Sequence, residues 1–221
     1  LGFILVSLVF AGLHAQTSFD EKFTNRANIG LTVTNIGIIG NAFDGSFNVE
    51  GFPSCEYPIG SGNEHLFDAG LWVGGLINGS VVAVSTGAVD ATTGYTTGRS
   101  GFEFTAEVGS TLEERSSLTN SPLFQPDAVS HQDFIADFTD KNVIIPGSLI
   151  LIDDHNNPMG LDVHMETYNW NFSFANFFVI LNYRITNGGS NTIDSLYVGY
   201  WADPVVRNIN VSPPGTSGFF T

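Results

Sequence analysis

Short alternations of apolar and polar residues recur along the chain, and the longer periodicity of an amphipathic helix is almost absent. Alternation with a period of two is typical of strands that bury one face. The segments that show it are GLTVTNIG (30–37), FEFTAEV (102–108), GSLILIDD (147–154) and LDVHMETYNWNF (161–172). DFIADFTD (133–140) fits either a strand or one helical turn. The pattern predicts an all-β protein, an antiparallel β-sandwich of immunoglobulin-like or jelly-roll-like type, with roughly ten strands and little helix.

Residues 69–87 form an uncharged run with Asn78-Gly79 at its centre. Asn-Gly is the strongest short signal for a hairpin, because both turn positions need a positive φ. A two-residue loop would place Ile77 opposite Ser80 and Val73 opposite Val84. A transmembrane helix is disfavoured here, since it would bury asparagine, serine and five glycines.

Two alternating runs flank Gly188-Gly189 and predict an antiparallel hairpin that rests on a core. The apolar face of the first run holds Phe177, Val179, Leu181, Tyr183 and Ile185, and that of the second holds Leu196, Val198, Tyr200 and Ala202. Tyr200 is therefore expected in the core. Tyr197, Trp201 and Asp203 lie on the opposite face and form the candidate binding face.

Pro204 should end this second strand, since proline has no N–H for the ladder. Arg207 is near enough in sequence to pair with Asp203.

Residues 1–15 have the features of a secretory signal peptide. Positions 1–13 carry no charge, and a small-x-small ending, Leu13-His14-Ala15, precedes Gln16. The usual basic n-region is missing, so we expect the signal peptide to be truncated at its start. We expect residues 16–221 to form the β-sandwich region, and we expect that region to continue beyond Thr221.

The formal net charge is −15, with only seven Lys and Arg residues. Nucleic-acid binding is excluded as a function class, because phosphate contacts from Lys and Arg supply most of that affinity. Few charges (13%) with 25 Gly and 19 Phe are typical of exported β proteins. The single cysteine, Cys55, cannot form an internal disulfide and is expected to behave as a small buried apolar residue.

Two turn-rich acidic segments would allow a calcium ion, although neither has the register of a calcium-binding loop. One contains Asp44, Ser46, Asn48 and Glu50, and the other is DDHNNPMG (153–160). The histidines of the mature chain, His65, His131, His155 and His164, have no zinc-ligand spacing. Asp162, His164 and Glu166 share one strand face, for which a polar solvent-facing surface is favoured over a ligand trio.

The chain has no nucleophile elbow, and its 22 acidic residues give no means of choosing a catalytic pair. We therefore predict no catalytic and no cofactor-binding residues, and no cofactor apart from the calcium considered above. Five aromatic side chains could stack on sugar rings, namely Trp72, Tyr168, Trp170, Tyr197 and Trp201.

The segment 160–208, GLDVHMETYNWNFSFANFFVILNYRITNGGSNTIDSLYVGYWADPVVRN, resembles uncharacterised, secreted, β-rich bacterial proteins that carry a C-terminal sorting domain for type IX secretion. FDAGLWVGGLINGS (67–80) and QDFIADFTD (132–140) are also similar to segments of that family, so the resemblance covers most of residues 28–211. It implies location and architecture but no activity. LTVTNIG (31–37) and YRITNGG (183–189) weakly resemble immunoglobulin-like surface repeats.

We therefore expect a non-catalytic β-sandwich region of a larger exported bacterial protein, secreted or held at the outer cell surface, with a structural, adhesive or binding role. Its expected partners are a polysaccharide or a cell-surface protein, and it should not span a membrane once the signal peptide is removed. The alternative is an accessory region of a secreted glycoside hydrolase or peptidase whose catalytic part lies downstream.

Overall fold

A computed structural model describes residues 19–41, 51–88 and 102–205. This part of the chain contains eleven strands and no helix, which confirms the all-β prediction. None of its segments is a helix long and apolar enough to cross a membrane. The strands form two antiparallel sheets, so the fold is a β-sandwich.

The larger sheet has seven strands and is organised around β5 (Leu66–Ile77). One edge of β5 pairs with β11 (Ile193–Pro204), and the other pairs with β3 (Ile38–Gly40) and then β6 (Val81–Thr86). The sheet is completed by β1 (Glu21–Phe23), β2 (Gly30–Thr34) and β4 (Cys55–Glu56). β5 is uncharged apart from Asp68, as a strand paired on both edges should be.

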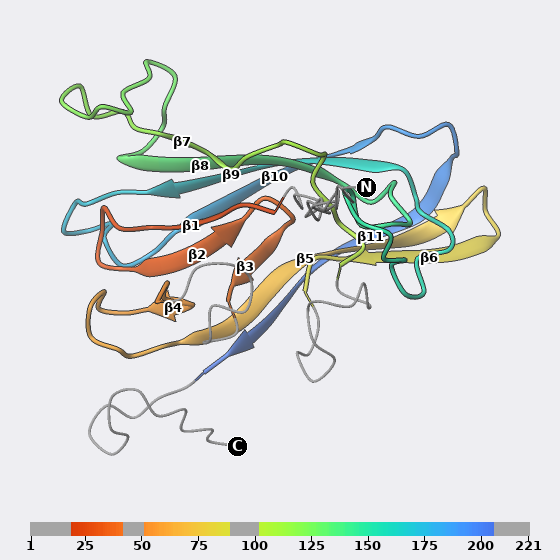
Figure 1. Ribbon diagram of the computed structural model, residues 1–221, viewed down its shortest axis with the longest axis horizontal. Coiled ribbons are helices and arrows are strands. Elements are labelled where there is room, and N and C mark those ends of the chain that lie inside the picture. The colour runs from red at the N-terminus through yellow and green to blue at the C-terminus, as the bar shows by residue number, and fades with distance from the viewer. Residues whose placement is uncertain (1–18, 42–50, 89–101, 206–221) are drawn as a thin grey trace, which may run out of the picture.

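The smaller sheet has the order β10-β9-β8-β7 (Figure 1). Its strands are β7 (Glu113–Arg115), β8 (Gln132–Thr139), β9 (Leu161–Asn169) and β10 (Ile180–Asn187). Apolar side chains from both sheets form one buried cluster, which includes Val33, Leu71, Val73, Phe134, Val163 and Met165. The strand expected at 161–172 is thus present as β9, and 133–140 is a strand rather than a helical turn.

Two of the predicted strands are wrong. Residues 102–108 form only an isolated bridge, between Thr105 and Thr139, and residues 147–154 form only one between Ile144 and Leu151. In the second case Gly147, with φ of 78°, and a hydrogen bond from Ser148 N to the Ile145 carbonyl (3.0 Å) make a turn that breaks the strand. In the first case both faces are buried, so Glu103 does not point to solvent as the alternation predicted.

The turn at Asn78-Gly79 is confirmed, with φ of 50° and 69°, but the predicted register is wrong by one residue. Ile77 lies opposite Val81, and Val73 lies opposite Ser85. The Asn78 N–H donates to the Thr192 carbonyl, and the Asn78 Oδ1 accepts from the Thr192 N–H. These two bonds fix the turn to the start of β11. A shift of one residue exchanges the two faces of a strand. The shift therefore turns Ser85 inward and leaves Val82 and Val84 exposed.

The predicted hairpin around Gly188-Gly189 is also wrong, because its two strands belong to opposite sheets. β10 pairs with β9 along its whole length, while β11 pairs with β5. The two glycines instead allow close packing of the backbone. The Gly188 N–H bonds to the Gly160 carbonyl at 2.9 Å, and a Cβ on Gly160 would lie 3.0 Å from the Cα of Gly189.

The orientation expected for the side chains of β11 is confirmed, but the burial expected for Tyr200 is not. Tyr200 lies opposite the buried Leu71 and so points between the sheets, yet it is 45% exposed. Its ring lies 6.2 Å from that of Tyr183 on β10. β10 and β11 are the last strands of their sheets, so the sandwich is open where these two rings meet.

The close approach of β5 to residues 87–88 predicts a strong effect of one added methyl group. A Cβ on Gly70 would lie 2.6 Å from the backbone carbon of Gly87, so Gly70→Ala should lower the free energy of unfolding by about 1–3 kcal/mol. Gly199→Ala is the control, because a Cβ there would meet nothing within 4 Å, and it should cost less than about 0.5 kcal/mol. Urea unfolding measures both, and equal stability of the two variants would contradict this packing.

Candidate functional site

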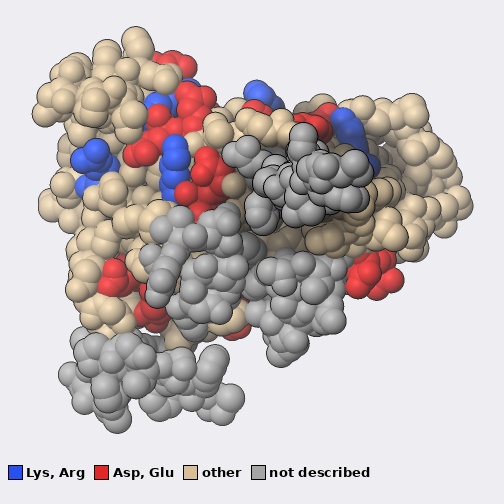
Figure 2. Space-filling model, in the orientation of Figure 1, with Lys and Arg blue, Asp and Glu red and all other residues tan. Residues whose placement is uncertain are grey.

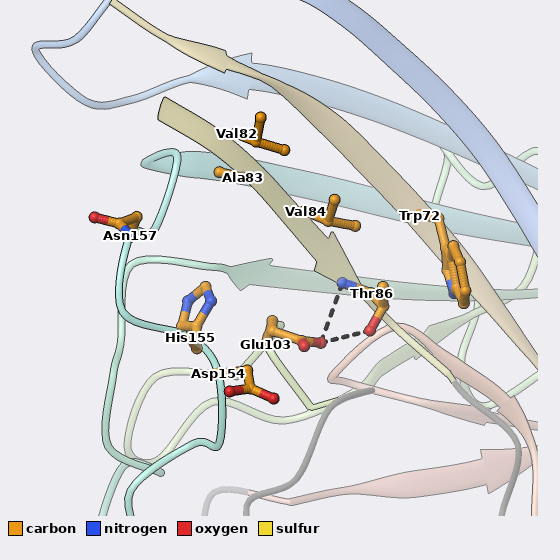
Figure 3. Close-up of a pocket in the computed structure, with 9 residues that line it drawn as sticks. All are labelled: Trp72, Val82, Ala83, Val84, Thr86, Glu103, Asp154, His155 and Asn157. Carbon is orange, nitrogen blue, oxygen red and sulfur yellow. Dashed lines mark hydrogen bonds between the residues drawn. The ribbon is translucent and has the colours of Figure 1, made fainter. Parts of the chain in front are cut away.

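A cavity of about 330 Å³ lies beside β6 (Figure 3). Trp72 of β5 and residues of β6 form one wall, and the loop that precedes β9 forms the facing wall. The complete lining consists of Trp72, Val82, Ala83, Val84, Thr86, Glu103, Asp154, His155 and Asn157. Apolar and aromatic groups thus face a small set of polar ones, which is the usual composition of a ligand site.

Glu103 is a fixed acceptor in the polar wall. Its carboxylate accepts hydrogen bonds from the Thr86 N–H (3.2 Å) and from the Thr86 hydroxyl (2.5 Å), and the residue is only 5% exposed (Figure 3). Hydrogen bonds to a carboxylate are among the strong ones, so they hold the side chain against the end of β6.

The facing loop is held by Asp140, a fully buried residue directly after β8. Its carboxylate accepts hydrogen bonds from the Ser85 hydroxyl (2.7 Å) and from the N–H groups of Met159 (3.0 Å) and Leu161 (2.6 Å). The Nε2 of His155 donates to the Asp140 carbonyl. Since a carbonyl only accepts, Nε2 carries the proton. Asp140 thereby joins β6 to the facing loop, both at His155 and where that loop leads into β9.

Trp72 connects the cavity to the outer face of the seven-stranded sheet. Its indole Nε1 donates to the Ala88 carbonyl at 2.7 Å, which fixes the ring. Opposite Trp72 on β11 is Gly199, which leaves open space, and the residues on either side of it on the same face are Tyr197 and Trp201. We call these three aromatic residues, Trp72, Tyr197 and Trp201, the aromatic row.

The structure brings two of the three predicted binding-face residues together. Tyr197, 77% exposed, and Trp201, half-buried, share the outer face as predicted. Asp203 is half-buried and lies where a register shift between Ala202 and Pro204 interrupts the alternation. Its predicted partner Arg207 lies outside the described residues.

The five aromatic residues considered for sugar stacking divide between the two sheets. Trp72, Tyr197 and Trp201 form the aromatic row, whereas Tyr168 and Trp170 lie at the end of β9 in the other sheet. Their rings are 6.1 Å apart, and Tyr168 donates to Glu166 at 2.6 Å.

Asp162, His164 and Glu166 do share one face of β9, where His164 Nε2 lies 3.7 Å from the Glu166 carboxylate and all three also contact residues outside the trio. Asp162 pairs with Lys141, and His164 Nδ1 lies 2.8 Å from Asp137. Glu166 accepts hydrogen bonds from Tyr168, Asn182 and Arg115. The bond from Tyr168 is the main cause that lowers the pKa of Glu166, and Asn182, His164 and Arg115 add to it. On the face drawn in Figure 2, Lys and Arg residues lie beside Asp and Glu residues.

No group of three or more potential metal ligands is found in the described part of the chain. The candidate calcium segment at 44–50 and the predicted signal peptide lie outside it. In the other candidate segment, 153–160, the side chains of Asp154, His155 and Asn157 line the cavity.

Cys55 is partly buried and packs against the core. Burial, together with the nearby Glu64 carboxylate, raises the pKa of its thiol to about 11. The thiol is therefore protonated at neutral pH and is a poor nucleophile.

Sequence reasoning found Trp72, Tyr197 and Trp201 but missed the polar wall of the cavity. Glu103 was assigned to a solvent face, Asp154 was considered only as part of a calcium segment, and His155 only there and among the histidines without zinc-ligand spacing. The run Asp153-Asp154-His155 after an apolar stretch was a usable signal for a polar loop. Nothing local showed that the loop faces β6, because Asp140 and Ser85 are far apart in sequence.

Comparison of the chain with protein-family models, with curated proteins and with solved structures gives no match.

Loss of the Asp140 carboxylate should loosen the cavity wall and destabilise the fold. Asp140→Ala leaves two buried N–H groups without their acceptor, so we expect a loss of about 2–4 kcal/mol in the free energy of unfolding. Asp137→Ala removes an exposed carboxylate that pairs only with His164 and should cost less than about 1 kcal/mol. If urea unfolding gave the two variants the same stability, the role assigned to Asp140 would be wrong.

The raised pKa of Cys55 predicts slow alkylation of the native protein. With a pKa of about 11, only about one thiol in a thousand is ionised at pH 8, far less than in an unfolded chain. Iodoacetamide at pH 8 should therefore modify the native protein at least about a hundredfold more slowly than the protein in urea. Mass spectrometry measures the rates, and a difference below about tenfold would show that the thiol is accessible and ionised.

Proposed function

We propose that this chain is a non-catalytic β-sandwich region of an exported bacterial protein, and that it binds carbohydrate on the outer face of its seven-stranded sheet. The signal-peptide features, the low Lys content and the resemblance to secreted type IX proteins support export to the cell surface or medium. The resemblance implies no activity, so the binding role depends on the site.

The observation that carries the proposal is that Trp72 belongs both to the cavity and to the aromatic row. The apolar faces of sugar rings pack on indole and phenol rings, while their hydroxyl groups need hydrogen-bond partners. The row offers the rings, and Glu103, Asp154 and Asn157 offer polar groups at one end of it. A chain of several sugar units fits this arrangement better than a small isolated molecule.

The anchored side chains also favour binding. The indole of Trp72 is fixed by Ala88, and the Glu103 carboxylate is fixed by Thr86. Groups that are already ordered lose little conformational entropy when a ligand arrives, which raises affinity.

Removal of a ring of the aromatic row should weaken oligosaccharide binding. We expect Trp72→Ala and Tyr197→Ala to reduce affinity at least about tenfold for whichever of the cello-, xylo-, manno- or chito-oligosaccharides binds the native protein, because each loses a stacked ring. Tyr197 is well exposed, so its replacement should leave the fold intact. Isothermal titration calorimetry gives the affinities.

The matched control is Trp170→Ala, in the other sheet, which should bind as the native protein does. Failure of all four sugar classes to bind, or equal affinity of the native protein and both row variants, would overturn the proposal.

A further inference from the structure

A second, apolar pocket lies on the other sheet, where the chain passes from β9 to β10. It has a volume of about 280 Å³ and is lined by Trp170, Phe172, Phe174, Ala175, Phe178 and Ile180. Phe174 is 73% exposed and Ile180 is 43% exposed. Several large apolar side chains in one exposed patch mark an interaction site.

Hydrogen bonds to two distant segments anchor the loop that forms the pocket. The Asn28 N–H bonds to the Asn176 carbonyl (3.0 Å), and the Asn171 N–H bonds to Nδ1 of His131 (3.0 Å). Phe172 and Phe174 stack with ring centroids 5.4 Å apart and planes inclined by only 8°. The walls of the pocket are therefore fixed by specific contacts at this end of the sheet.

The pocket lies at the start of a free sheet edge. Ile180, which lines it, is the first residue of β10. β10 pairs with β9 on one side, and no other strand among the described residues pairs with its second edge. The unused N–H and C=O groups of such an edge can pair with an added strand. The edge carries neither proline nor lysine, two of the residues that commonly protect sheet edges.

The stretch of sequence that forms the pocket and β10 contains no acidic residue, although Glu166 and Asp162 of β9 lie opposite Asn182 and Thr186 of β10. Between Glu166 and Asp194 the only charged residue is Arg184, which is exposed and makes no ion pair with any described residue. Ile180 and Arg184 lie four residues apart on one strand, so they point to the same face. They lie opposite Tyr168 and His164 in the register with β9.

We propose that the free edge of β10 and the aromatic pocket together bind an extended peptide segment of a partner protein as an added strand. Main-chain hydrogen bonds to β10 supply part of the affinity, and the pocket supplies the specificity. The bound segment places a large apolar side chain in the pocket and a carboxylate opposite Arg184. Because directly opposed residues share a face, these two residues of the partner are four positions apart.

A second copy of this chain satisfies the site less well. In a two-fold antiparallel pairing of β10 with itself, Ile180 lies opposite the end of the partner strand, around Thr186 and Asn187, which has no apolar side chain for the pocket. Two chains of net charge −15 also repel each other. A lipid surface would use the aromatic side chains but not the hydrogen-bonding edge.

Two synthetic peptides of about eight residues, the length of β10, test the proposal. Both consist of threonine and valine apart from one glutamate and one phenylalanine. In the first peptide the glutamate is four positions before the phenylalanine, as antiparallel pairing with β10 requires. In the second it is four positions after the phenylalanine, as parallel pairing requires. At least one should bind and shift the indole N–H signal of Trp170 in the NMR spectrum. Phe174→Ser should weaken its binding at least about tenfold. Phe124→Ser, an exposed phenylalanine in another loop, should have no effect.

Charge reversal and backbone blocking separate the parts of the proposal. Arg184→Glu should weaken binding at least about threefold, and a peptide with lysine in place of glutamate should recover affinity on that variant. Peptides N-methylated at alternate positions should not bind, since they cannot pair with β10.

Equal binding of the methylated peptides, or no shift of Trp170 with either peptide, would overturn the proposal. The proposal would also be overturned if the protein bound phosphatidylcholine vesicles, or dimerised with increasing concentration, and Phe174→Ser abolished that behaviour. The proposed sugar site at Trp72 is on the seven-stranded sheet, whereas the proposed peptide site is on the four-stranded sheet. The carbohydrate proposal and the peptide proposal can therefore fail independently.

Discussion

The pairing of β5 on both of its edges is the constraint on which the rest of the structure depends. One edge is occupied by β11 and the other by β3 and β6, so three other strands pair with β5. Its inward side chains, such as Leu71 and Val73, belong to the core, and its outward Trp72 joins the cavity to the aromatic row. Gly70 lets residues 87–88 approach its backbone closely, which a larger residue would prevent. The core and the proposed sugar site therefore depend on the same strand.

Alternation of apolar and polar residues was enough to predict the fold class and the two faces of β11. It placed Tyr197 and Trp201 on one face and Tyr200 on the other, and the structure agrees. The same alternation says which face a residue occupies but not which strand lies beside it. For this reason β10 and β11 were expected to form a hairpin, whereas they are the last strands of opposite sheets, at the open edge of the sandwich.

The Asn78-Gly79 turn could be predicted from its residue types, but the register of the two strands that it joins could not. Asn78 and Gly79 have the positive φ values that the sequence predicts, yet the long-range bonds of Asn78 to Thr192 accompany a shift of one residue. The polar wall of the cavity was beyond prediction for a similar reason. Glu103 and His155 are brought to β6 by tertiary contacts with Thr86 and Asp140, and no local pattern encodes such contacts.

The two outer faces of the sandwich differ in chemistry, and the three tryptophans of the chain report on them separately. Trp72 and Trp201 belong to the aromatic row, and Trp170 belongs to the apolar pocket. The most direct test of the carbohydrate-binding account is a ¹⁵N–¹H NMR titration of the labelled protein with the oligosaccharides, in which each indole N–H gives one signal. The account predicts that the signals of Trp72 and Trp201 shift together and saturate while that of Trp170 stays in place. A shift of Trp170 alone, or no shift of any indole signal, would contradict it.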